Sequence, residues 1–379
     1  MIIRIAFIGI GGFAAVPIRA LLARKRNDIS IVGAVDPYSE ASPIFQTIKG
    51  LCPIYENEEL LYQRARPHLV VISTPIGFHA EQIRRAVSHG VSVLCEKPLT
   101  GDIADLPELL SAERKAPFVS VGYQWSYGSA IQTLKTDIIN GKFGRPIRMK
   151  TIVLWPRNKK YFNRSTGWAG KRFDKDGRKI SDSVVNNATA HYLHNMLYLL
   201  GNKRHTAARA EEVRAILLRV NDIETFDTVT ARFRVKGAEA LFIASHAVKK
   251  TVDPTFEYTF EKGKVIYPDK EGGIRAIFEN EEIAYGNPFA EGADHKIIYC
   301  IERLKEGRLP DLCGVAAASE QVRFIDALEK FSVTSITDYA KEENEYVYAD
   351  GLDDLLEECY QNFSLLEWTR LKRLSGGSL

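Results

Sequence analysis

The sequence predicts an α/β fold in two domains, and three observations indicate it. The chain has 379 residues, more than one ordinary hydrophobic core holds. Residues 1–122 alternate short apolar runs with amphipathic helical patterns, which is typical of a doubly wound parallel sheet with helices on both faces. Residues 213–283 contain one strand pattern after another, which indicates a second sheet. We therefore expect one domain at 1–122 and a second at 123–379.

In the first domain, strands and helices are expected in alternation. Strands buried on both faces of a sheet read as continuous apolar runs, and the runs here have that form. They predict strands at 2–8, 29–35, 69–74, 91–95 and 118–121, and the helical patterns between them include 13–26, 79–89 and 103–114.

The second domain begins with a helical pattern over 130–140 that ends at Gly141. A long polar segment over 156–181 is expected to be a binding loop or partly disordered. A helix over 183–200 is expected to end at Gly201. The other expected elements are strands at 147–155, 213–220, 228–235, 238–246, 255–261, 264–267 and 274–278, a hairpin loop at 261–264, and helices at 291–305, 315–330 and 352–374.

Composition and charge exclude several classes of function. The 51 basic and 48 acidic residues leave a net charge of +3, which gives no electrostatic footprint for nucleic acid or a membrane surface. No apolar run approaches the roughly 18 residues of a membrane span. The N-terminal apolar run leads straight into a glycine turn, unlike a signal peptide. The five cysteines are scattered, so we expect reduced thiols and a cytoplasmic protein.

The strongest local motif is a glycine-rich turn directly after the first strand. Gly9, Gly11 and Ala14 match the pattern G-x-G-x-x-G/A. Gly9 permits a tight turn, Gly11 lets the backbone approach a pyrophosphate, and the small Ala14 lets the helix pack on the sheet. The helix that opens here directs free N–H groups at phosphates. The expected pyrophosphate contacts are therefore Gly9, Gly11, Gly12, Phe13 and Ala14.

Asp36 ends the second strand, at the spacing of about 20 residues where an acid accepts hydrogen bonds from the adenosine ribose. This carboxylate would repel the 2′-phosphate of NADP, and Pro37 and Tyr38 follow it without an arginine. NAD is therefore expected, with NADP disfavoured. The alternative is a Rossmann-like domain that binds another nucleotide or none.

A second group of polar residues follows two later strands of the same sheet. Ser73, Thr74 and Pro75 follow one strand, with His79 soon after, and Glu96-Lys97-Pro98 follows the next. Open α/β sheets bind ligands at the carboxyl ends of their strands. We expect further cofactor contacts here, although Glu96 and Lys97 could instead form a surface ion pair of little consequence. The expected contacts are Ser73, Thr74, Pro75, His79, Glu96 and Lys97.

Together these motifs resemble the Gfo/Idh/MocA family, which includes glucose–fructose oxidoreductases and inositol dehydrogenases. The resemblance continues through Gly122-Tyr123-Gln124 and Gly141-Lys142-Phe143-Gly144-Arg145-Pro146, and it covers most of the chain to about residue 201. It implies a Rossmann domain followed by an α/β domain with a large, open, mainly antiparallel sheet. It also implies hydride transfer between NAD and a secondary alcohol of a sugar, inositol or related polyol, in a homodimer or homotetramer.

The resemblance also implies residue roles. Lys97 is the catalytic lysine near the nicotinamide and the substrate hydroxyl, and the Lys97-Pro98 peptide is cis. His191 closes the family's D-x-G-x-H segment and is the second catalytic residue, because a neutral histidine can accept the hydroxyl proton. In this chain Asn187 replaces the usual aspartate and Thr189 the usual glycine. On a helix, Asn187, His191 and His194 would share one face.

The remaining candidates concern the substrate. Aromatic and cationic side chains in the polar segment suit a sugar ring, although that segment could instead be solvated or face another subunit. His191 and His194 could be buried helix histidines, and because no cysteine or acid completes a metal set beside them, no metal is expected. The expected substrate contacts are Lys97, Gln124, Arg164, Trp168, Asn187, His191 and His194.

Two alternative functions stay open at this point. Some relatives of this fold cleave glycosidic bonds with a tightly held NAD that is reduced and reoxidised in each cycle. The replacement of the acid by Asn187 also allows a non-catalytic sensor that binds NAD or a sugar.

Overall fold

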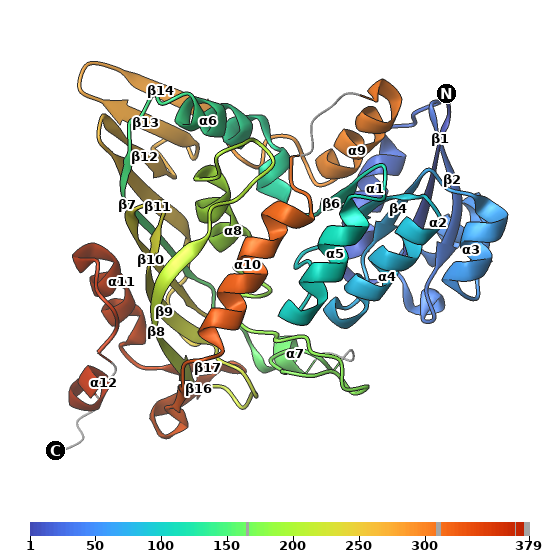
Figure 1. Cartoon of the computed structure of the whole chain (residues 1–379). Coiled ribbons are helices and arrows are strands. Elements are labelled where there is room, and N and C mark those ends of the chain that lie inside the picture. The colour runs from blue at the N-terminus through green and yellow to red at the C-terminus, as the bar shows by residue number, and fades with distance from the viewer. Residues whose placement is uncertain (164–166, 308–311, 368, 375–379) are drawn as a thin grey trace. The chain divides into compact units, whose positions relative to one another are not determined.

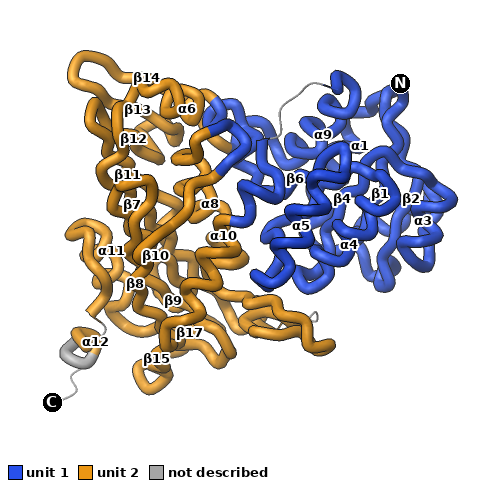
Figure 2. Tube along the Cα trace, viewed as in Figure 1, with its two compact units in different colours: residues 1–132, 203–206, 289–319 blue, residues 133–202, 207–288, 320–379 orange. Residues whose placement is uncertain are grey.

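The computed structural model describes residues 1–163, 167–307, 312–367 and 369–374. The chain forms two compact units that are not continuous in sequence, as Figure 2 shows by colour. Unit 1 comprises Met1–Gln132, Lys203–Thr206 and Phe289–Ser319, and unit 2 comprises Thr133–Asn202, Ala207–Pro288 and Glu320–Leu379. The predicted division at residue 122 did not include this return of the chain to unit 1.

Unit 1 is built on a parallel sheet of six strands in the order β3-β2-β1-β4-β5-β6. The predicted doubly wound sheet is therefore confirmed. The order runs outward from β1 in both directions, so the chain switches sides between β1 and β4, where sheets of this kind bind ligands. The strands are β1 (Ile3–Ile8), β2 (Ile29–Val35), β3 (Ile54–Tyr55), β4 (Leu69–Ile72), β5 (Ser92–Cys95) and β6 (Val119–Val121).

Helices cover both faces of this sheet (Figure 1). On one face, α1 (Ala15–Ala23), α2 (Phe45–Leu51) and α9 (His295–Glu306) bury an apolar cluster against β1 and β4. Fully buried side chains such as Phe7 and Ile301 belong to it, and each contributes roughly 1.5–3 kcal/mol. The helices α3 (Glu58–Ala65), α4 (Ile76–Ser88) and α5 (Leu106–Glu113) follow β3, β4 and β5.

Unit 2 contains a mixed, mainly antiparallel sheet of nine strands in the order β14-β13-β12-β11-β7-β10-β9-β8-β15. Only the β7–β10 and β8–β15 pairs are parallel among the nine. The strands are β7 (Pro146–Leu154), β8 (Ala210–Arg219), β9 (Thr228–Val235), β10 (Ala238–Ser245), β11 (Val252–Phe260), β12 (Gly263–Tyr267), β13 (Ile274–Phe278), β14 (Glu282–Gly286) and β15 (Val333–Ser335).

Helices pack on both faces of the second sheet. On one face, Phe233 of β9 contacts Phe324 of α10 (Val315–Leu328), with ring centroids 4.8 Å apart. On the other, α11 (Leu352–Asn362) buries its apolar side against β7 and β10. The predicted helix over 352–374 is wrong in one respect: α11 ends before Phe363, which has a positive φ of 54°, and α12 (Thr369–Leu374) is separate.

The helix predicted over 183–200 begins later than expected. The structure places α8 at Ala190–Leu199, and a series of turns precedes it. Polar side chains explain this later start, because their hydrogen bonds to nearby backbone groups compete with the backbone hydrogen bonds of a helix. The Asn186 amide donates to the carbonyls of Ile180 and Ser181, and the Thr189 hydroxyl donates to that of Val184. Asn187 therefore precedes the helix, and its predicted place on one helical face with His191 is wrong.

The remaining α-helices and strands of the described residues are α6 (Ser129–Ile139), α7 (Lys159–Phe162), β16 (Ala340–Glu343) and β17 (Tyr346–Ala349), of which the last two pair as a hairpin. Within the part of the chain that the structure describes, no helix combines the length and apolar character that crossing a bilayer requires.

Candidate functional site

The glycine turn after β1 has the geometry that the sequence predicts. Gly9 has a positive φ of 83°, and a Cβ built on it would lie 2.8 Å from the carbonyl oxygen of Ser73. Only glycine fits here, because the turn passes directly against the end of β4. A short 3-10 turn over Gly12–Ala14 leads into α1, and Ala14 is buried against the sheet. Gly12 and Phe13 are exposed, and because Gly12 has no side chain, its backbone is accessible to a phosphate.

Asp36 fastens the end of β2 to this turn. Its Oδ2 accepts a hydrogen bond from the backbone N–H of Ile10 at 2.9 Å, and its Oδ1 accepts one from Tyr38 at 2.8 Å. The side chain is thus fixed beside Gly11, whose Cβ position is 3.8 Å from Oδ2. Each carboxylate oxygen has a further lone pair. Asp36 can therefore accept bonds from ribose hydroxyls while it holds the turn.

The residues after β4 are tied to the rest of unit 1. The Ser73 N–H donates to Ile8 at 2.8 Å, and the Thr74 hydroxyl donates to Gln82 on α4 at 2.5 Å. Ser73 and Thr74 are half-buried and Pro75 is exposed. These three residues lie at the carboxyl end of the sheet, as predicted.

His79 connects the loops that follow β4 and β5. Its side chain is 1 % exposed, with Nδ1 2.8 Å from the carbonyl oxygen of Pro98 and Nε2 2.9 Å from that of Thr74. Burial lowers the pKa of His79, and the two carbonyls oppose this effect. Both ring nitrogens are engaged inside the protein, so the contacts show a brace, and a direct part in cofactor binding stays a prediction.

The Glu96-Lys97-Pro98 turn follows β5. The Glu96 N–H donates to Ile72 at 2.8 Å, and the Lys97-Pro98 peptide is cis, as the resemblance implies. Glu96 and Lys97 are both half-buried. The Glu96 side chain is only 13 % exposed. Its carboxylate pairs with Lys296 of α9, a residue that the sequence interpretation missed. The sequence did offer one indication that Lys296 is buried: it lies four residues before Cys300, on the apolar side of α9.

Gln124 lies in a 3-10 turn shortly after β6, at the carboxyl end of the same sheet. Its side-chain nitrogen donates to the carbonyl of Gly292 at 3.4 Å, and the side chain is partly exposed. The predicted contact of Gln124 with a substrate stays a prediction.

In unit 2, the segment before α8 carries the other predicted residues. Asn187 is half-buried, and its amide donates to the Tyr161 hydroxyl at 3.2 Å. His191 lies in the first turn of α8 and is also half-buried.

His194 has different surroundings from His191. It is 1 % exposed and stacks on Tyr198 at 5.4 Å between ring centroids. Burial, and then the charge of Lys135, lower the pKa of His194 to about 3. His194 is thus buried in the helix, which was the alternative weighed for it, and its predicted contact with a substrate stays a prediction.

The long polar segment is folded where the structure describes it. The Gly170 N–H donates to Asp182 at 2.6 Å, and Phe173 forms a β-bridge with Lys179. Trp168 is half-buried, and Arg164 lies outside the described residues.

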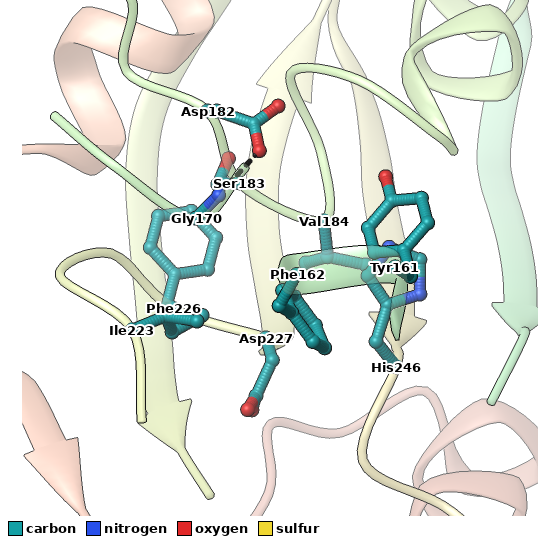
Figure 3. A pocket seen from close by; sticks show the side chains of 10 residues that line it. All are labelled: Tyr161, Phe162, Gly170, Asp182, Ser183, Val184, Ile223, Phe226, Asp227 and His246. Atoms are coloured by element: carbon teal, nitrogen blue, oxygen red, sulfur yellow. Dashed lines mark hydrogen bonds between the residues drawn. The ribbon is translucent and has the colours of Figure 1, made fainter. Parts of the chain in front are cut away.

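A small pocket lies where this segment packs on the second sheet (Figure 3). Tyr161 lines it and also accepts the bond from Asn187, so the pocket adjoins the turn before α8. Asp227 lines it as well, and burial raises the pKa of this carboxyl. The other lining residues are Phe162, Gly170, Asp182, Ser183, Val184, Ile223, Phe226 and His246.

A metal centre finds no support among the side chains that the structure describes. Within them, no group of three or more His, Cys, Asp or Glu residues is placed to hold a metal ion.

Comparisons with known proteins agree with the Rossmann-type sheet of unit 1. Residues 3–123 match a family described as an oxidoreductase family with an NAD-binding Rossmann fold. Inositol 2-dehydrogenase 2 of Mycolicibacterium vanbaalenii is 27% identical over 169 residues, which are 43% of this chain and 48% of that protein. Glucose-6-phosphate 3-dehydrogenase of Bacillus subtilis is 27% identical over 183 residues, 48% of this chain and 49% of that one. The chain therefore spans about half the length of these curated relatives.

Solved structures share the fold over a larger part of the chain. The WlbA dehydrogenase of Bordetella pertussis, in complex with NADH and UDP-GlcNAcA, has a TM-score of 0.69 at 20% identity, over 87% of this chain and 96% of that one. An oxidoreductase domain protein of Kribbella flavida has a TM-score of 0.71 at 19% identity, over the same shares. At such identity the likeness is one of fold.

Proposed function

Because residues 3–123 belong to the Gfo/Idh/MocA oxidoreductase family, with its NAD-binding Rossmann domain, we propose that this chain is an NAD-dependent oxidoreductase. It transfers a hydride between NAD and a secondary alcohol of a sugar, an inositol or a related polyol. The observation that carries the proposal is the Asp36 carboxylate, bonded to the Ile10 N–H of the glycine turn at 2.9 Å. The named activities of the two curated relatives supply the substrate class.

The residues present fit an NAD molecule. Within the turn from Gly9 to Ala14, the exposed Gly12 offers backbone for the pyrophosphate, and Asp36 offers lone pairs for the adenosine ribose. The same negative charge disfavours a 2′-phosphate, which supports NAD over NADP. Ser73, Thr74, Pro75 and Glu96 stand at the carboxyl ends of β4 and β5 for the remaining contacts. When bound, NAD supplies the hydride acceptor.

Two side chains carry the proton chemistry in this proposal. His191, as a neutral imidazole, accepts the proton of the substrate hydroxyl. Lys97 orients the same oxygen and stabilises the negative charge that develops on it. Asn187 cannot take a proton, so it serves as a hydrogen-bonding contact. Gln124 and Trp168 are proposed as further substrate contacts, and His194 as a packing residue behind His191.

A substrate panel tests the proposal. Purified protein is mixed with NAD and with inositols, free sugars and sugar phosphates, and the absorbance of reduced NAD is followed. We expect at least one polyol of the panel to reduce NAD. The variant Lys97→Ala should lose at least 100-fold in turnover, on the order of one acid–base group, and should still bind NAD in calorimetry. Full activity of Lys97→Ala would refute its role.

One observation favours a second candidate function. Asn187 stands in the position of the family's aspartate and donates to Tyr161, which suits a sensor that binds NAD and a sugar without turnover. Binding of both ligands with no reduction across the panel would support the sensor. Restored turnover in Asn187→Asp would identify this residue as the cause.

The homodimer or homotetramer implied by the resemblance also remains a proposal. Because α11 covers β7 and β10 on one face of the second sheet, an association through that face would use the strands from β11 to β14. Light scattering of the purified protein measures the state directly.

A further inference from the structure

Lys296 is a buried cation in unit 1 that the proposed chemistry does not use. It is the second residue of α9, and its side chain is 2 % exposed. Its ammonium pairs with Oε1 of Glu96, whose side chain is 13 % exposed, and donates to the carbonyl of Gly122 at 3.5 Å. A charge buried this deeply is retained only where its partner is fixed.

The Lys296 ammonium lies where three loops meet at the carboxyl end of the parallel sheet. Glu96 follows β5, Gly122 follows β6, and the ring of Phe13 in the glycine turn after β1 has its centroid 5.8 Å from Nζ. A Cβ added to Gly122 would lie 3.0 Å from Glu96 Oε2 and 3.0 Å from Lys296 Nζ. The ion pair therefore packs directly on the backbone, which leaves the carboxylate little freedom to turn.

A second lysine on the same helix shows the contrast. Lys305 pairs with Asp28, but the two side chains are 26 % and 35 % exposed. Water screens such a pair, and exposed ion pairs of this kind contribute little. The Lys296–Glu96 pair is shielded from water, so its loss would leave one charge buried without compensation.

We propose that Lys296 is a positioning residue for the Glu96-Lys97-Pro98 turn. Its ammonium holds one carboxylate oxygen of Glu96, so that the other is presented in a fixed direction to a ribose hydroxyl of the cofactor. Lys296 itself touches neither cofactor nor substrate. This inference rests on the proposed function, because it assumes that Glu96 contacts NAD.

Calorimetric titration with NAD, without any substrate, tests the proposal. Lys296→Met should raise the Kd for NAD by about tenfold, the order of one charge-assisted hydrogen bond. Lys296→Arg keeps the charge and should restore most of the affinity. Lys305→Met is the matched control on the same helix, and its Kd should equal that of the wild type.

Two measurements separate positioning from a general loss of structure. Thermal unfolding of each variant reports whether it folds. The double variant Glu96→Gln with Lys296→Met removes both charges, so it should fold better than Lys296→Met alone and still bind NAD weakly. With a substrate from the panel, Lys296→Met should raise KM for NAD more than it lowers kcat.

The outcomes are distinct. If folded Lys296→Met binds NAD with the wild-type Kd, the inference is overturned and the proposed function is left intact. The same holds if Lys305→Met loses as much affinity for NAD as Lys296→Met does. Failure of the wild-type protein to bind NAD overturns both. The positioning role is supported if Lys296→Met loses about tenfold in affinity for NAD and Lys296→Arg recovers most of it.

Discussion

The bond between Asp36 and the glycine turn makes a specific prediction for the variant Asp36→Asn. The change keeps the size of the side chain and removes its charge. In the native chain, Oδ2 accepts from Ile10 and Oδ1 from Tyr38. An asparagine amide has one acceptor oxygen and an NH2 group that only donates, so one of the two backbone N–H groups loses its partner.

The magnitude follows from the bonds that are lost. Hydrogen bonds to a charged group contribute about 1.5–3 kcal/mol each. If the turn and the ribose together lose the equivalent of one such bond, the Kd for NAD rises by about 10- to 100-fold. The same change removes the repulsion of a 2′-phosphate, so the Kd for NADP should rise less or fall.

Calorimetric titration of NAD and NADP into wild type and Asp36→Asn measures both effects. Glu40→Gln is the matched control, since Glu40 is an exposed carboxylate on the next turn, and it should change neither Kd. A Kd for NAD in Asp36→Asn within about twofold of the wild-type value, well below the loss expected for one bond, would refute the assignment of Asp36 to the ribose.

Two further predictions concern stability. Gly9→Ala should lower the free energy of unfolding by about 1–3 kcal/mol, because its Cβ would lie 2.8 Å from the Ser73 oxygen, whereas Gly12→Ala, with no atom within 4 Å, should lose less; equal losses in thermal unfolding would contradict this. His194 has its pKa lowered from 6.5 to about 3, so between these values the unfolded chain binds a proton that the folded chain does not. Stability should therefore fall below about pH 6.5 by up to about 1.4 kcal/mol per pH unit. Urea unfolding at about pH 7 and about pH 5 should show a smaller loss for His194→Phe than for wild type, and identical losses would rule the reasoning out.

The parallel sheet was predictable because its central strands are buried on both faces. All residues of Leu69–Ile72 are buried, so the strand reads as an uninterrupted apolar run. The strand β14 was missed for the opposite reason. It lies at a sheet edge, and its residues alternate between exposed and half-buried, which leaves little apolar signal.

The candidate site was predictable where local spacing defines it and not where distant segments meet. The turn from Gly9 to Ala14 and Asp36 follow a fixed local pattern. The pairing of Glu96 with Lys296 joins residues 200 positions apart, and the local sequence around either residue does not indicate its partner. The start of α8 was misplaced because helical periodicity does not register the side-chain bonds of Asn186 and Thr189 to local backbone.

Contacts between neighbouring loops help to hold the carboxyl end of the first sheet in one conformation. Asp36 joins the loop after β2 to that after β1, His79 joins the loops after β4 and β5, and Lys296 joins those after β5 and β6. Between β1 and β4, the close approach of Gly9 to Ser73 has the same effect. These loops lie beyond the ladder of the sheet, so they need such contacts to keep one conformation. A site that is fixed before its ligand arrives spends less binding free energy on ordering, which is why substitutions at Asp36 and Lys296 should weaken cofactor binding.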